Sequence, residues 1–202
     1  MKTSLMIPAF VAVLAVPTMA SANLVTNGSF ETYDTSVANQ SGGGWWGYNA
    51  GNGGIDGWTV GMTSVDTVTA PYAVQNGASA LDLAGTPGPG SVEQSIATSV
   101  GGSYLVSFYG MASGLSGTNA DVNLNFGSAS QTFNMTGSYQ QYTMLATASS
   151  ASSLLKLATA PSNTTNGNLL VDNVSVQAVP EPASMAALGL GALGILKRRK
   201  KA

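Results

Sequence analysis

The chain has 202 residues, of which 8% are charged, and it contains neither cysteine nor histidine. A disulfide framework is therefore excluded, as are histidine-based nucleophile relays and the commonest transition-metal ligand. Apart from Lys156, the basic residues lie at Lys2 or in 197–201, so residues 23–179 carry a charge of about −7, which argues against nucleic-acid binding.

The N-terminus has the composition of a signal peptide. Lys2 precedes an apolar stretch from Leu5 to Val16. Ala20 and Ala22 are small residues at the spacing that signal peptidase requires. We therefore expect residues 1–22 to be removed by signal peptidase during export.

Residues 23–179 have the pattern of one all-β domain. Short runs alternate between apolar and polar residues; in DVNLNF, for example, Val122, Leu124 and Phe126 fall on one face. About ten such runs are separated by turn residues, which predicts a two-sheet antiparallel β-sandwich of jelly-roll type. The segment 41–54, SGGGWWGYNAGNGG, has too many glycines for a strand interior, so we expect a long surface loop.

Three aromatic residues of that segment are candidate ligand contacts. Trp45, Trp46 and Tyr48 lie within four positions of one another. Neutral sugars stack their apolar faces on aromatic rings, and an exposed aromatic group on a loop indicates a binding surface. The alternative is that one tryptophan folds back over the core. Trp58, in IDGWTV, is expected in the core.

Two carboxylates are candidate metal ligands. In LLVDNVSV, strict alternation puts Asp172 on the same face as Val174 and Val176, at the edge of the core. Glu31 ends the first strand-like block, and the first and last strands of such a sandwich can lie side by side. Together with backbone carbonyls, the two side chains would form an oxygen cage suited to one structural Ca²⁺. The alternative is that Asp172 caps a turn and that Glu31 is solvated.

The C-terminus combines three features in order. Pro180, Glu181 and Pro182 form an extended, exposed triplet. Residues 183–196 carry no charge and are expected to form an apolar helix of about 21 Å, shorter than the ~30 Å hydrocarbon core of a membrane. Five basic residues, 197–201, follow. The segment could be a weak membrane anchor or an ordinary C-terminal anchor helix.

This arrangement resembles the PEP-CTERM sorting signal of Gram-negative envelope bacteria. The resemblance implies that residues 180–202 are recognised by an exosortase at Pro180-Glu181-Pro182. It also implies transient membrane anchoring by residues 183–196 and release to the cell surface or extracellular matrix.

The body of the chain resembles the choice-of-anchor C family of exported bacterial proteins. The resemblance is carried by NGSFE, which ends at Glu31, and by DNVSV, which begins at Asp172. That family is similar to galactose-binding-like jelly rolls and to carbohydrate-binding modules with that fold. The implied calcium ligands are the Glu of the opening motif and the Asp of the closing one.

These observations favour a non-enzymatic exported protein that binds neutral polysaccharide. One alternative is a structural matrix protein or adhesin of biofilm or floc without a specific ligand. Another is a glycoside hydrolase, which would need two carboxylates flanking a cleft, and no local pattern in the sequence marks such a pair.

Overall fold

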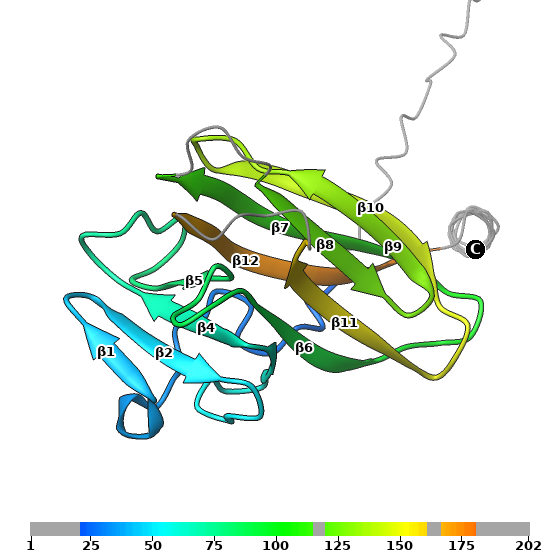
Figure 1. Cartoon of the computed structure of the whole chain (residues 1–202). Coiled ribbons are helices and arrows are strands. Elements are labelled where there is room, and N and C mark those ends of the chain that lie inside the picture. Colours follow the sequence, from blue (N-terminus) through cyan, green and yellow to red (C-terminus); the bar gives the residue numbers. More distant parts are fainter. Residues whose placement is uncertain (1–20, 115–119, 161–166, 181–202) are drawn as a thin grey trace, which may run out of the picture. The chain divides into compact units, whose positions relative to one another are not determined.

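The computed structural model describes residues 21–114, 120–160 and 167–180, and these residues form two antiparallel β-sheets (Figure 1). Residues 21–180 constitute one compact unit with its own core. The predicted two-sheet antiparallel sandwich is therefore confirmed. Within the described ranges, no helix is long and apolar enough to cross a membrane.

The larger sheet has seven strands in the order β1-β2-β4-β5-β12-β7-β10. Their bounds are β1 Gln40–Gly42, β2 Trp45–Asn49, β4 Ser64–Val68, β5 Ala80–Asp82, β12 Asn168–Val179, β7 Ser103–Ser113 and β10 Gln140–Thr147. The smaller sheet has the order β3-β6-β11-β8-β9. Its strands are β3 Thr59–Met62, β6 Gly90–Ala97, β11 Ser152–Thr159, β8 Asp121–Phe126 and β9 Ala129–Asn134. A single 3₁₀ turn, Thr35–Val37, precedes β1 within the described residues.

The main core lies between the sheets and follows the alternation of the strands. On β8, Val122, Leu124 and Phe126 are all buried, as the sequence predicts. Trp58 is also buried, and its indole N–H donates to the Asn27 carbonyl at 3.0 Å. The predicted core position of Trp58 is therefore confirmed.

The N-terminal segment lies beside the last strand. The Leu24 N–H donates to the Val176 carbonyl at 2.9 Å, and the Val174 N–H donates to the Gly28 carbonyl at 2.8 Å. A side chain at Gly28 would overlap the Val174 carbonyl, so only glycine permits this approach. The expected adjacency of the first and last segments is confirmed.

A bulge in β12 changes the face on which Asp172 lies. Residue pairing with β7 shifts between Asp172 and Ser175, and Asn173 adopts a left-handed conformation with φ 49°. Val174 belongs to the main core, whereas Asp172 lies two residues after Leu170, whose side chain packs in a separate cluster on the outer face. The predicted common face for Asp172 and Val174 is wrong, because the extra residue reverses the alternation.

The glycine-rich segment 41–54 is not a long loop. β1 and β2 form a hairpin in register, and β2 continues into the sheet by pairing with β4. Gly44, with φ 85°, supplies the left-handed position of the turn. The loop prediction is wrong because pairing with β4 and the packing of the aromatic residues outweigh the weak strand propensity of glycine.

Ala22 and Pro180, two of the predicted processing residues, are both exposed. Ala20, Glu181 and Pro182 lie outside the described residues, as do residues 1–20 of the predicted signal peptide 1–22 and the predicted apolar helix 183–196.

Two leucines of β11 test which face of the smaller sheet packs against the core. Leu157 is fully buried, whereas Leu154 is 43% exposed. We expect Leu157→Ala to lower the free energy of unfolding by about 2–5 kcal/mol, because it leaves a cavity in the core. Leu154→Ala should change it by about 0.5 kcal/mol or less. Equal effects of the two substitutions in denaturant unfolding would contradict the assignment of Leu157 to the buried face and Leu154 to the exposed face.

Candidate functional site

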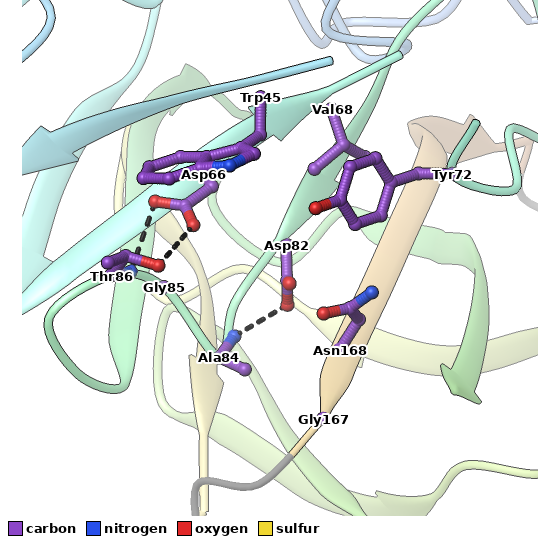
Figure 2. A pocket seen from close by; sticks show the side chains of 10 residues that line it. All are labelled: Trp45, Asp66, Val68, Tyr72, Asp82, Ala84, Gly85, Thr86, Gly167 and Asn168. Carbon is purple, nitrogen blue, oxygen red and sulfur yellow. Dashed lines mark hydrogen bonds between the residues drawn. The ribbon is translucent and has the colours of Figure 1, made fainter. Parts of the chain in front are cut away.

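A pocket opens on the outer face of the larger sheet, where β2, β4, β5 and the start of β12 come together (Figure 2). Its volume is about 280 Å³. Aromatic, carboxylate and amide side chains line it together with short loop residues. The lining residues are Trp45, Asp66, Val68, Tyr72, Asp82, Ala84, Gly85, Thr86, Gly167 and Asn168.

The Trp45 indole forms one wall and lies against glycines. Trp45 and Gly42 are paired across the β1–β2 hairpin, and a Cβ at Gly42 would overlap the indole Nε1. A Cβ at Gly47 would lie 3.4 Å from the indole Cζ3. The missing side chains allow the indole to lie along the sheet surface. Gly42 and Gly47 thereby account for part of the glycine content that had predicted a loop.

Tyr72 forms the second aromatic wall. Its position is fixed by a turn in which the Tyr72 N–H donates to the Thr69 carbonyl at 2.9 Å. Trp45 and Tyr72 both pack on a small buried cluster consisting of Val68, Ala80, Met111 and Leu170. Figure 2 shows the two rings on either side of the space that Asp82 enters. Both rings therefore border the pocket and rest on a buried apolar cluster.

Asp66 and Asp82 are register partners on neighbouring strands, β4 and β5. Asp66 accepts hydrogen bonds from the N–H and the hydroxyl of Thr86, at 3.1 and 2.9 Å. Asp82 Oδ1 accepts from the N–H groups of Ala84 and Leu169, at 2.9 and 2.7 Å. No donor among the described residues reaches Asp82 Oδ2. These bonds fix the loop after β5 over the sheet and hold both carboxylates in place.

Burial raises the pKa values of both pocket carboxyls. Desolvation is the main cause for Asp82, and the charge of Asp66 contributes, so that the pKa of Asp82 is raised to about 7. The pKa of Asp66 is also raised by burial, against the opposing effect of the Thr86 hydrogen bonds. Among the described residues the sole cationic side chain is Lys156, and it pairs with Glu93 at 3.5 Å on the smaller sheet. The pocket is therefore acidic and has no cationic residue among those that line it.

Of the three predicted aromatic contacts, only Trp45 lines this pocket. Trp46 is the next residue in the strand and packs against the main core, with its ring centroid 5.7 Å from that of Tyr33. Tyr48 is fully buried, and its hydroxyl donates to the Asp34 carbonyl at 3.3 Å. The prediction of one exposed group of three aromatic side chains is wrong, because strand alternation separates them.

Four further lining residues were not predicted from the sequence: Asp66, Tyr72, Asp82 and Asn168. A usable signal existed for the two acids. Asp66 lies one residue after Val65, and Asp82 lies between Leu81 and Leu83. A lone carboxylate in an apolar strand needs a local partner or a function, which is the argument that had singled out Asp172.

Glu31 and Asp172 hold the same loop. Asp172 Oδ2 accepts from the N–H groups of Gln75 and Asn76, at 3.0 and 2.9 Å. Glu31 Oε1 accepts from the N–H groups of Ala78 and Ser79, both at 3.0 Å. Burial, and to a smaller degree the charge of Glu31, raises the pKa of Asp172 to about 6. The two carboxylates are close enough to interact electrostatically.

This arrangement accommodates a cation only in part. Two neighbouring carboxylates without a cationic side chain suit a hard divalent ion. However, hydrogen bonds from backbone N–H groups already occupy one oxygen of Glu31 and both oxygens of Asp172, whose Oδ1 accepts from the Asn173 N–H at 2.6 Å. Within the described ranges, no three acidic, histidine or cysteine side chains converge. Backbone carbonyls would have to complete the coordination of a metal.

A second hollow lies on the outer face of the smaller sheet. It is lined by Met62, Asn123, Asn125, Gly127, Leu154, Lys156, Ala158 and Thr159. None of these residues is aromatic, so the hollow lacks a stacking surface. The pocket at Trp45 is therefore the stronger candidate.

Asp82 gives the stability of the domain a predictable pH dependence. Its carboxyl ionises near 3.8 in the unfolded chain and near 7 in the folded domain. The folded state therefore binds more protons between these values, so this site's contribution to stability is present below about pH 4 and is lost as the pH rises to about 7. Asp82→Asn should raise the Tm at about pH 8 and change it little at about pH 4. Thermal melts across this range check the expectation, and a Tm difference that is independent of pH would contradict it.

Comparison with known proteins gives one sequence match and several similar folds. Residues 178–201 match the PEP-CTERM protein-sorting motif. No curated protein sequence matches the chain. The motif confirms the predicted sorting signal and indicates an exported protein sorted to the cell surface by an exosortase.

The solved structures with similar folds include carbohydrate-binding modules. A CBM4 module is 20% identical with a TM-score of 0.44, over 77% of this chain and 99% of the module. The module TmCBM61, in complex with β-1,4-galactotriose, is 13% identical with a TM-score of 0.48, over 79% and 100%. An arabinose-bound α-L-arabinofuranosidase, MgGH51, is 12% identical with a TM-score of 0.51, over 79% of this chain and 27% of the enzyme. The last likeness places the β-sandwich of this chain among known folds and concerns the fold alone.

Proposed function

We propose that residues 23–179 form a non-enzymatic carbohydrate-binding domain, which an exosortase-dependent route delivers to the cell surface or extracellular matrix of a Gram-negative bacterium. Signal peptidase would remove residues 1–22, and residues 183–196 would anchor the chain in the membrane before processing. The choice-of-anchor C family remains the predicted relationship for the body of the chain.

The pocket at Trp45 is the observation on which the binding function rests. A sugar ring has an apolar C–H face and a rim of hydroxyls. The indole of Trp45 and the ring of Tyr72 offer surfaces for the face, while Asp66, Asp82 and Asn168 offer hydrogen-bonding groups for the rim. A volume of about 280 Å³ suits one or two sugar units of a longer polymer.

The position of the pocket along β12 suits a surface-displayed binder. Asn168, a lining residue, begins β12, and Val179, next to the sorting triplet, ends it. At roughly 3.3 Å per residue the two positions are on the order of 36 Å apart. A chain held at its C-terminal end would thus keep the pocket well away from the point of attachment.

The first test concerns Trp45 and the glycine beneath it. We expect wild-type residues 21–180 to be retained on at least one polysaccharide, and Trp45→Ala to weaken this binding about tenfold or more, a loss of at least about 1.4 kcal/mol. Gly42→Val should have a similar effect, because the new side chain would displace the indole. Gly43→Val is the matched control, since a Cβ at Gly43 meets nothing within 4 Å.

Polysaccharide retention, measured by affinity electrophoresis or pull-down, distinguishes the remaining functions. If Trp45→Ala and Gly42→Val leave the retention unchanged, the pocket at Trp45 is not the polysaccharide-binding site. Failure to bind any glycan would favour the structural matrix protein or adhesin. Release of reducing sugar that is lost in Asp66→Asn would favour a glycoside hydrolase.

We also propose one structural Ca²⁺ at Glu31 and Asp172. A cation bound only by the folded state stabilises it by mass action, about 2.7 kcal/mol at 100 times the Kd. Melts in calcium and in chelator should therefore differ by several degrees, and Asp172→Asn should abolish this difference. Asp82→Asn, which alters a different carboxylate, should retain it. Identical wild-type melts would refute the calcium site without affecting the pocket.

A further inference from the structure

We propose that the pocket at Trp45 selects a sugar that carries a protonated primary amine, such as a hexosamine unit of a polysaccharide that is not fully N-acetylated. This inference rests on the proposed function, since it names the class of sugar that the same pocket takes.

The two carboxylates of the pocket have no cationic partner among the residues that line it. Asp66 and Asp82 are directly opposed in an antiparallel ladder, a geometry that separates the two Cα atoms by about 4.5–5.5 Å. The lining residues include no cation. The preceding segment 161–166, PSNTTN, carries no charged residue in the sequence. A ligand with a positive charge would stabilise both carboxylates in their charged form, whereas with a neutral sugar the repulsion is relieved only when Asp82 binds a proton.

One carboxylate oxygen of Asp82 is open to a ligand, although most of the side chain is buried. Asp82 is only 4% exposed, yet it lines the pocket (Figure 2). Its Oδ1 holds two backbone N–H groups, and its Oδ2 has no donor among the described residues. Because Asp82 lines the pocket, this oxygen can accept a hydrogen bond from a ligand that enters it.

An ammonium group suits these carboxylate acceptors better than a hydroxyl group does. Carboxylates only accept hydrogen bonds, and an ammonium group only donates, with three N–H bonds. No donor from the described part of the chain reaches Asp82 Oδ2, and each oxygen of Asp66 holds one hydrogen bond from Thr86, which leaves it further accepting capacity. Charge-assisted hydrogen bonds are about twice as strong as those between neutral groups, so an ammonium has an advantage over a hydroxyl at this position.

The aromatic walls favour an organic cation over a metal ion. The faces of tryptophan and tyrosine attract cations within about 6 Å of the ring, and they also accept the apolar face of a sugar. A calcium ion instead needs six to eight oxygens. The Trp45 and Tyr72 rings and the Val68 side chain lie beside the carboxylates, and none of these ring faces or methyl groups can act as a calcium ligand. For the same electrostatic reason, uronic acids and sulfated sugars should be excluded.

Three β-1,4-linked trisaccharides test the proposal, because they differ only in the group at carbon 2. These are the trimers of glucose, N-acetylglucosamine and glucosamine, with free glucosamine and galactosamine as probes that do not depend on linkage. Calorimetric titration of residues 21–180 at neutral pH should show an amino sugar bound at least about tenfold more tightly than its uncharged counterpart. Asp82→Asn should abolish this preference, and Trp45→Ala should weaken the binding of all sugars. Glu93→Gln, at the carboxylate that pairs with Lys156 on the other sheet, is the charge-matched control and should keep the preference.

Each outcome decides a different point. Equal or tighter binding of the uncharged sugars would overturn the amine preference and leave the proposed function standing. Sugar binding that is lost in chelator and restored by calcium would replace the ammonium with a metal ion. If wild-type protein binds none of these probes but retains a polysaccharide through Trp45, the amine proposal fails alone. If no sugar or polysaccharide is bound, both proposals fail.

Discussion

Backbone N–H groups hold the buried acidic side chains of this domain, because the described residues contain a single cationic side chain. Asp66 and Asp82 bind the segment 84–86 and the start of β12, while the buried Asp172 and the exposed Glu31 bind the segment 75–79. These hydrogen bonds satisfy some of the carboxylate oxygens and position the segments that precede and follow β5. They do not cancel the negative charge. The same constraint that orders the loops therefore leaves an acidic pocket.

The pocket also depends on where side chains are absent. Gly42 and Gly47 leave the surface on which the Trp45 indole lies, and a Cβ at Gly47 would come within 2.9 Å of Asp66 Oδ1. Gly85, with φ 53°, allows the loop after β5 to pass close to the Ser64 carbonyl. The glycine-rich composition of this region is thus a requirement of a compact site, in which one aromatic ring lies flat and a carboxylate is placed beside it.

Local alternation predicted the fold well, and it failed where the chain departs from regular pairing. The pattern on β8 and the adjacency of the first and last segments were both predictable, because they follow from strand periodicity and sandwich topology. The reversal of Asp172 was not predictable, since one extra residue at a bulge changes the face of all that follow. The β1–β2 hairpin was missed because its pairing with β4 is not visible in local composition.

The site was less predictable than the fold for the same reason. Trp45 was identified, but adjacent residues on a strand face opposite ways, so its neighbour Trp46 could not belong to the same surface. Asp66 and Asp82 are 16 positions apart and meet only through the β4–β5 ladder. No spacing rule within the sequence could have brought them together with Tyr72 and Asn168. Local sequence thus supplies the candidates, and strand register selects those that meet.

Sugar binding at Trp45 can be tested directly, because the three tryptophans of the chain provide three indole N–H signals. Trp45 lines the pocket, Trp46 packs against the main core, and the Trp58 N–H is held by Asn27. NMR titration of residues 21–180 with the bound sugar should therefore shift the indole N–H signal of Trp45 and leave those of Trp46 and Trp58 nearly unchanged. A sugar that binds with a measurable Kd but leaves the Trp45 signal unchanged would contradict the account.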